Sequence, residues 1–186
     1  MSTAANEMFR RGLLSGRFIL VVTAPLAGEG SEGSFGCAVA EDTKRLGAWV
    51  GTSAHDAVVA EPGGFDMLVV DGDALFAAGG LGACLEGAWE ATAAVVNEAF
   101  LPAARGGRIV YLAPAPGAGA QADAARAGLE NLARTLSVEW ARHEITVVTI
   151  ALGDGTNPGE AAALVAYLAS PAGAYFSGCQ LDLRGV

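Results

Sequence analysis

The feature that most constrains this chain is a regular alternation between short apolar runs and longer segments with helical periodicity. The apolar runs, read as strands, are 18–23, 48–52, 67–70, 108–113, 145–151 and 180–183. The helical segments are 37–46, 82–104, 121–143 and 160–169. Strands that alternate with helices form β-α-β units with parallel strands and right-handed crossovers. The pattern predicts an α/β protein with a doubly wound parallel sheet.

The two longest helical segments differ in how their apolar residues are distributed. In 121–143 they recur every three or four positions and form one stripe. In 83–104 they cover almost the whole circumference, which is typical of a helix buried on more than one side. We expect another subunit to provide the second covering, with a deeply packed core helix as the alternative. The residues expected at this interface are Val95, Val96, Phe100, Leu101, Leu132, Leu136 and Trp140.

Composition narrows the class of partner. The chain has 186 residues, a formal net charge of −9 and no basic run longer than two residues, which argues against nucleic acid or an anionic membrane as a partner. Its mean hydropathy is +0.39, yet no apolar run reaches the length of about 18–20 residues that a membrane span needs. Three scattered cysteines predict neither a disulfide framework nor a metal site.

The ends of the chain add two expectations. Residues 1–16 lack the long apolar stretch of a signal peptide, so we read them as a lead segment of a cytoplasmic protein. Residues 17–186 contain no linker or repeat and are expected to form a single domain.

Three stretches resemble the short-chain dehydrogenase/reductase family in detail and in the right order. "GGRIVYLAPAPG" (106–117) is similar to the strand that carries the family's catalytic serine. "RAGLENLARTLSVEWARHEITVVTIALG" (126–153) is similar to the catalytic helix and the following strand, and 158–186 to the C-terminal helix, loop and closing strand. The resemblance runs from Phe18 to Val186 and implies a Rossmann-like fold for 17–186.

The residues that carry the family's chemistry are replaced. The resemblance implies a tyrosine acid, a lysine four residues later, a serine and an asparagine. The matching positions here are Ala122, Arg126, Pro114 (or Ala113 if the register shifts by one) and Trp89. Alanine, proline and tryptophan offer no general acid, and arginine is a fixed fork rather than a compact ammonium. No catalytic residue is therefore expected, and Tyr111 is predicted to be a core residue.

The cofactor turn and two enclosing segments also depart from the family pattern. The turn has Ala24 in place of the first glycine, and it carries Glu29 and Glu32, which would repel a phosphate. Its glycines, Gly28, Gly30, Gly33 and Gly36, are spread over a longer loop. Only 53–64 separates the second strand from the third, so one strand and its flanking helices are expected to be missing. Only 151–158 stands where the family carries a substrate lid. No cofactor is expected.

These observations predict a catalytically inactive subunit that pairs with a full-length, active member of the family, or with itself, through its two long helices. In that role it would support the partner's oxidoreductase activity. One alternative is a weak or altered oxidoreductase, or a ligand-binding protein, that retains a nucleotide or acyl-thioester site. NAD(P) would be its cofactor only in that case. A homodimeric scaffold is a further alternative.

Overall fold

The computed structural model describes residues 9–23, 33–52 and 64–185. In this part of the chain, six strands form one parallel sheet in the order β2-β1-β3-β4-β5-β6. The strands are β1 (Phe18–Val22), β2 (Trp49–Gly51), β3 (Met67–Asp71), β4 (Gly107–Ala113), β5 (Ile145–Ala151) and β6 (Gln180–Asp182). The predicted α/β fold with a parallel, Rossmann-like sheet is confirmed.

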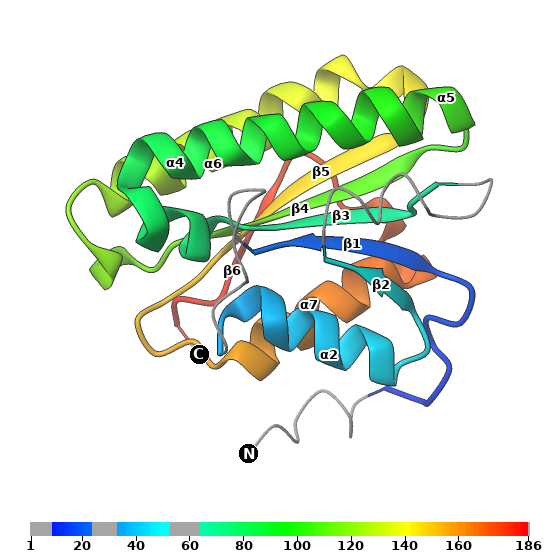
Figure 1. Cartoon of the computed structure of the whole chain (residues 1–186), viewed down its shortest axis with the longest axis horizontal. Helices are drawn as coiled ribbons and strands as arrows, with labels where there is room; N and C mark the ends of the chain where they lie inside the picture. Colours follow the sequence, from blue (N-terminus) through cyan, green and yellow to red (C-terminus); the bar gives the residue numbers. More distant parts are fainter. Residues whose placement is uncertain (1–8, 24–32, 53–63, 186) are drawn as a thin grey trace.

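Helices cover both faces of the sheet (Figure 1). On one face lie α4 (Gly72–Val95) and α6 (Ala122–Glu139), and on the other lie α2 (Phe35–Arg45) and α7 (Pro158–Ala169). The shorter helices are η1 (Val96–Phe100), α5 (Leu101–Ala103), η2 (Pro116–Ala118), η3 (Ala141–His143) and η4 (Pro171–Tyr175). The arrangement is doubly wound, as the alternating pattern predicted.

Helix α4 begins ten residues earlier than the periodicity indicated. It starts at Gly72 rather than at Gly82, directly after β3 ends. The early part was missed because Gly79 and Gly80 leave helical geometry, and Gly80 has a φ of 70° and a ψ of −154°. Such backbone is accessible essentially only to glycine. The helix is therefore two helical pieces joined by a kink, and its far end continues into the π-helical turn η1.

Each face of the sheet has its own apolar core. Between the sheet and the α4 and α6 layer lie Leu68, Val70, Ile109 and Tyr111, all at most 1 % exposed. The other core fills the space toward α2 and α7. Leu14 is completely buried in it, and its N–H donates to Leu46 O at 3.0 Å. The described part of the lead segment, 9–16, thus packs onto the domain.

Two expected shortenings concern the segments after β2 and β5. Of residues 53–64, which were expected to stand in place of a strand and its helices, 53–63 lie outside the described residues. Between β5 and α7 the described chain has only residues 152–157, which form a turn and the start of a helix cap. No helix in the described part of the chain is long and apolar enough to cross a membrane.

Candidate functional site

The carboxyl ends of the strands form the edge of a doubly wound sheet where ligands bind. At this edge Arg126, in the second turn of α6, is only 7 % exposed. Its Nη1 donates to Pro114 O at 2.6 Å and to Leu152 O at 3.0 Å, the residues that follow β4 and β5. Its nearest carboxylate is the exposed Asp123, 3.9 Å from Nε. The guanidinium therefore ties the ends of two strands to α6.

The structure brings together three of the four positions that the family resemblance matches to catalytic residues. Pro114 follows β4 and is buried, and Ala122 begins α6 with 1 % of its surface exposed. Arg126 lies one turn beyond Ala122 and contacts Pro114 O. Trp89 is instead 49 % exposed on α4. The side chains of Pro114 and Ala122 carry no polar group, and the guanidinium of Arg126 is already engaged with backbone carbonyls.

The start of α2 is the place where a Rossmann-like fold binds a pyrophosphate. Here Asp71, the last residue of β3, sends its carboxylate to that helix. Its Oδ2 accepts from Gly36 N at 2.7 Å, while Oδ1 accepts from Ala74 N at 3.0 Å and caps α4. Ser34 Oγ accepts from Cys37 N at 3.1 Å. Two N–H groups of the first turn of α2 thus bind the chain's own oxygens.

Asp71 is a site residue that sequence reasoning missed. In the sequence it only follows the apolar run 67–70, although aspartate directly before a helix is a common N-cap. The side chain is fully buried, and burial raises its pKa while the N–H donors of Ala74 and Gly36 lower it. Burial likewise raises the pKa of neighbouring Asp73. Burial and these two carboxylates raise the pKa of the Cys84 thiol to about 12.

The glycines of the predicted cofactor turn are only partly described. Gly28 and Gly30, with Ala24 and the two glutamates, lie outside the described residues. Gly33 has a φ of 91° just before α2. At Gly36 a Cβ atom would lie 2.3 Å from Thr23 Cγ2 and 3.0 Å from Asp71 Oδ2. This glycine lets α2 pack closely against the chain's own strand ends. No cluster of potential metal ligands occurs among the described residues.

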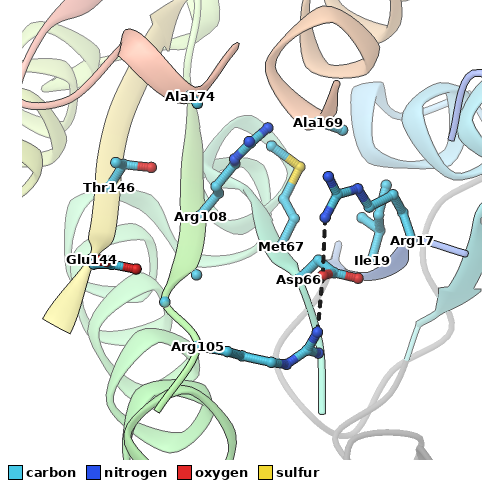
Figure 2. Close-up of a pocket in the computed structure, with 12 residues that line it drawn as sticks. Arg17, Ile19, Asp66, Met67, Arg105, Arg108, Glu144, Thr146, Ala169 and Ala174 are labelled. Atoms are coloured by element: carbon cyan, nitrogen blue, oxygen red, sulfur yellow. Dashed lines mark hydrogen bonds and ion pairs between the residues drawn. The ribbon is translucent and has the colours of Figure 1, made fainter. Parts of the chain in front are cut away.

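The opposite, amino edge of the sheet carries a cavity of about 330 Å³ that the sequence did not indicate. Figure 2 shows Arg17 and Arg105 converging on Asp66, with Arg108 beside them. Arg17 and Arg105 lie 3.3 and 3.2 Å from Asp66 Oδ1. These charges are far apart in sequence, but each stands at or just before the start of a strand. Parallel strands place all such positions at one edge, and this shared position is the signal that could have revealed the cluster.

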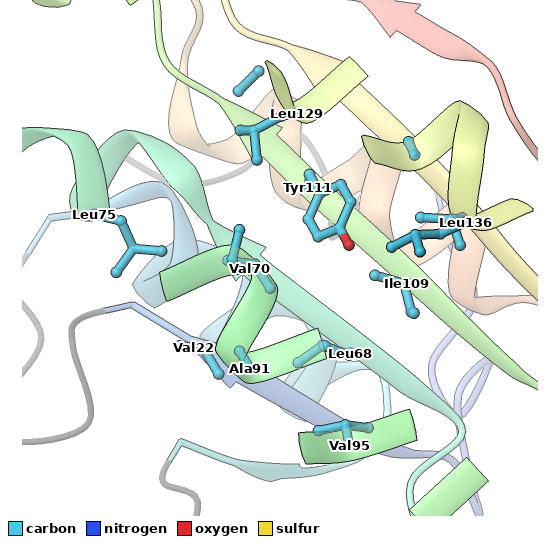
Figure 3. Close-up of a cluster of buried hydrophobic side chains, with 14 of the residues drawn as sticks. Val22, Leu68, Val70, Leu75, Ala91, Val95, Ile109, Tyr111, Leu129 and Leu136 are labelled. Atoms are coloured by element: carbon cyan, nitrogen blue, oxygen red, sulfur yellow. The ribbon is translucent and has the colours of Figure 1, made fainter. Parts of the chain in front are cut away.

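The side chains beneath α4 and α6 confirm one prediction and correct another (Figure 3). Tyr111 is a core residue, as predicted, with no exposed surface and its hydroxyl 2.9 Å from Thr92 Oγ1. Four residues expected at a partner interface lie in the chain's own core, exposed by 6 % or less: Val95, Val96, Phe100 and Leu136. They cannot be the surface that a partner covers. Leu101, Leu132 and Trp140 pack against this core but remain partly exposed.

The burial of these four side chains has a simple cause. The exposed positions of α4 are largely alanine, glycine, glutamate and Trp89. Counting alanine and glycine as apolar makes the helix look apolar all round, whereas its large side chains form one broad inward stripe. The alternative of a packed core helix is therefore correct for Val95, Val96 and Phe100.

Known structures share this fold. A citronellol catabolism dehydrogenase (AtuB) from Pseudomonas aeruginosa PAO1 is 23 % identical, with a TM-score of 0.72, over 96 % of this chain and 98 % of that one. BdcA (YjgI) from E. coli is 23 % identical, with a TM-score of 0.61, over 92 % of this chain and all of that one. The sequence matches no protein-family model and no curated protein. At this identity the likeness establishes the fold.

Proposed function

We propose that this chain is a catalytically inactive relative of the short-chain dehydrogenases, and that it pairs with an active relative through the outer faces of α4 and α6. The proposal rests on the burial and the contacts of the Arg126 side chain. Arg126 stands at the lysine position of the family's catalytic motif. Its buried guanidinium donates hydrogen bonds to Pro114 O and Leu152 O, and it thereby holds the fold together. Supporting an active partner is the function that this arrangement favours.

Loss of the acid supports the first half of the proposal. A reductase of this fold must deliver a proton to the substrate oxygen from a positioned group. Ala122 stands at the tyrosine position and is buried, so the site offers a methyl group there. Tyr111 is the nearest tyrosine in sequence, but its hydroxyl is buried against Thr92 and its pKa is raised by burial. It is poorly suited to exchange protons with a substrate.

The charge at the start of α2 supports the absence of a dinucleotide. A bound pyrophosphate would need the N–H groups that Asp71 and Ser34 already engage. It would also approach the Asp71 carboxylate, and Asp73 lies close enough to raise the pKa of Asp71 further. The engaged N–H groups and the negative charge of the carboxylates both oppose binding of a polyanion.

We expect no binding of NAD⁺, NADH, NADP⁺ or NADPH of physiological strength. Calorimetric titration measures the dissociation constant of each nucleotide, with an active short-chain dehydrogenase as the positive control in the same buffer. A dissociation constant in the micromolar range, roughly −8 kcal/mol of binding free energy, would contradict this expectation and favour the alternative of a protein that retains a nucleotide site.

The surface available to a partner is the outward side of the helix pair. Helices α4 and α6 pack closely, because Gly128 brings α6 against Leu85 of α4. On their outward sides Trp89 is 49 % exposed and Val138 is 76 % exposed. Large apolar side chains in water forgo roughly 1.5–3 kcal/mol each relative to burial. Together with the partly exposed Leu132, they are the apolar groups that a partner would cover.

Co-purification from the native host, followed by mass spectrometry, tests the pairing. We expect Trp89→Glu and Val138→Glu each to reduce recovery of the partner at least about tenfold, since truncating an interface anchor costs about 2 kcal/mol or more. Tyr175→Glu is the matched control, because Tyr175 is 92 % exposed but belongs to η4, which packs against α7. Far-ultraviolet circular dichroism verifies that all three variants remain folded.

Two results would count against this function. Equal recovery of the partner with wild type and with folded Trp89→Glu and Val138→Glu variants would exclude the outer helix faces as the interface. A wild-type chain that sediments as a monomer and recovers no related dehydrogenase would exclude the pairing itself.

A further inference from the structure

The amino-edge cavity is built on a row of residues in register across four neighbouring strands. Ile19 pairs with Met67, Met67 with Arg108, and Arg108 with Thr146. Residues paired in parallel register face the same side of the sheet, here the side of α7. The row changes from apolar to polar at Arg108, beside the end of α7 and the start of η4, where Ala169 and Ala174 line the cavity.

Three arginines line this cavity, Arg17, Arg105 and Arg108, against two carboxylates, Asp66 and the exposed Glu144. Asp66 Oδ1 is shared between Arg17 and Arg105, and Asp66 Oδ2 accepts from Phe18 N at 2.8 Å. One carboxylate therefore serves two guanidinium groups. Among the described residues, no carboxylate lies within ion-pair distance of Arg108. This accumulation stands out in a chain whose net charge is −9 and whose lysines and arginines number only 11.

Arg108 is held in place by backbone oxygens. Its Nη1 donates to Leu168 O and to Ser170 O, at the end of α7, where a cation suits the helix dipole. Burial lowers the pKa of Arg108, and the positive charge of Arg17 lowers it further. The guanidinium is thus fixed beside another cation, and an anion between them would relieve the repulsion.

We propose that this cavity binds a small ligand through a phosphate group, held between Arg17 and Arg108 with Arg105 at its rim. The site lies at the edge of the sheet opposite to the pair of strand ends that Arg126 joins, and it is independent of the function proposed above. Its ligand would be inorganic phosphate or the phosphate of a small phosphoester.

The arginines already oriented by the fold favour a phosphate. A guanidinium carries five N–H donors, and among the described residues Arg17 uses only its contact with Asp66. Arg105 donates to Asp66 and, at 2.8 Å, to Gly64 O. Asp66 thus orients two planar donor groups without saturating them, and arginine forks match phosphate oxygens in pairs. The volume of about 330 Å³ is at the lower end of small-molecule sites, so it admits a phosphate with a small organic group.

The test is calorimetric titration of the whole chain at low ionic strength, where screening is weakest. The probes are inorganic phosphate, glycerol 3-phosphate and adenosine monophosphate, with succinate as a dicarboxylate for comparison. We expect at least one phosphate compound to bind saturably, with a dissociation constant of roughly 1 mM or lower. The phosphate compound that binds tightest identifies the source of the group.

Three variants locate the binding site. Arg17→Gln and Arg108→Gln should each weaken phosphate binding at least about tenfold, because each removes a charged donor. Arg134→Gln is the matched control, since this arginine is 63 % exposed on α6 and pairs with Glu130. It should leave phosphate binding unchanged. Because Arg108→Gln also removes contacts with α7, Arg17→Gln is the decisive variant if Arg108→Gln does not fold.

Three results would overturn the proposal. The first is that no phosphate compound binds saturably at concentrations up to about 10 mM, which is about ten times the expected dissociation constant. The second is an equal loss of binding in Arg17→Gln and Arg134→Gln, which would show a nonspecific charge effect. The third is succinate binding as tightly as inorganic phosphate, which would show that the cavity does not select a phosphate group.

Discussion

At the scale of single residues, Arg126 shows how one buried guanidinium can hold a fold together. Arginine keeps the positive charge of lysine but presents a rigid fork of donors. Here one arm of the fork reaches two carbonyl oxygens on neighbouring strand ends. Buried carbonyls that lose their donor are costly. The side chain therefore stabilises the carboxyl edge of the sheet.

Arg126→Met tests this structural role. Methionine keeps much of the length of the buried stem but donates no hydrogen bond, so Pro114 O and Leu152 O lose their partner. We expect the free energy of unfolding to fall by about 1–3 kcal/mol. Arg134→Met on the exposed face of α6 should change it by no more than about 0.5 kcal/mol. Urea unfolding measures both, and equal effects would remove the structural role assigned to Arg126.

The raised pKa of Asp73 predicts how the stability of the fold changes with pH. Burial raises its pKa in the folded chain above the ordinary value of 3.8, so the folded state binds its proton more tightly than the unfolded state. Its contribution to stability is complete below the unfolded pKa and is lost as pH rises through the folded pKa. Asp73→Asn removes this loss and keeps an acceptor for Ala115 N. The stability of the variant relative to wild type should therefore rise from pH 4 to pH 7, roughly the window that starts at the unfolded pKa.

Thermal unfolding of Asp73→Asn and wild type across this range measures the difference. Asp154→Asn is the control, because Asp154 is exposed although it accepts from Gly117 N at 2.7 Å. A constant difference between Asp73→Asn and wild type at all pH values would show that Asp73 does not titrate differently in the folded chain.

At the scale of elements, the strands were predictable and the longest helix was not. Strand β5 has the predicted bounds, and β1 and β4 differ from theirs by one residue, because buried parallel strands are short, continuous apolar runs. The early part of α4 was not predictable, since the Gly79-Gly80 pair indicates a turn in sequence. The inward direction of Val95 and Phe100 was also missed, because it depends on the sheet that covers them.

The kink in α4 can be tested at two glycines that differ in backbone and not in surroundings. A Cβ atom at either Gly80 or Gly82 would meet no atom within 4 Å. Only Gly80 has positive φ, with a ψ that side-chain-bearing residues avoid. We expect Gly80→Ala to lower the free energy of unfolding by about 1–3 kcal/mol. Gly82→Ala should be neutral or stabilise by up to about 1 kcal/mol. Equal effects in chemical denaturation would show that the kink does not require glycine.

At the scale of the whole molecule, the order of strands and helices was predictable because alternation permits few topologies. The gathering of Arg17, Asp66 and Arg108 around one cavity was not, because their separations in sequence hide their shared edge of the sheet. That Ala122 and Pro114 carry no side-chain group able to donate a proton could be read from the sequence alone. The carboxylate at the start of α2 could not, since it depends on how β3 and α2 meet.

The strand order also determines how the molecule opens. Strands β3 and β4 are paired on both sides and covered on both faces, whereas β2 and β6 are three-residue strands with one paired neighbour each in the described sheet. Backbone amides in edge strands exchange their hydrogens through local fluctuations, whereas amides in central strands exchange only through global unfolding. Deuterium exchange followed by mass spectrometry should label β2 and β6 first, and β3 and β4 only at the rate of complete unfolding. Equally fast labelling of β3 and β2 would mean that the sheet opens through its middle.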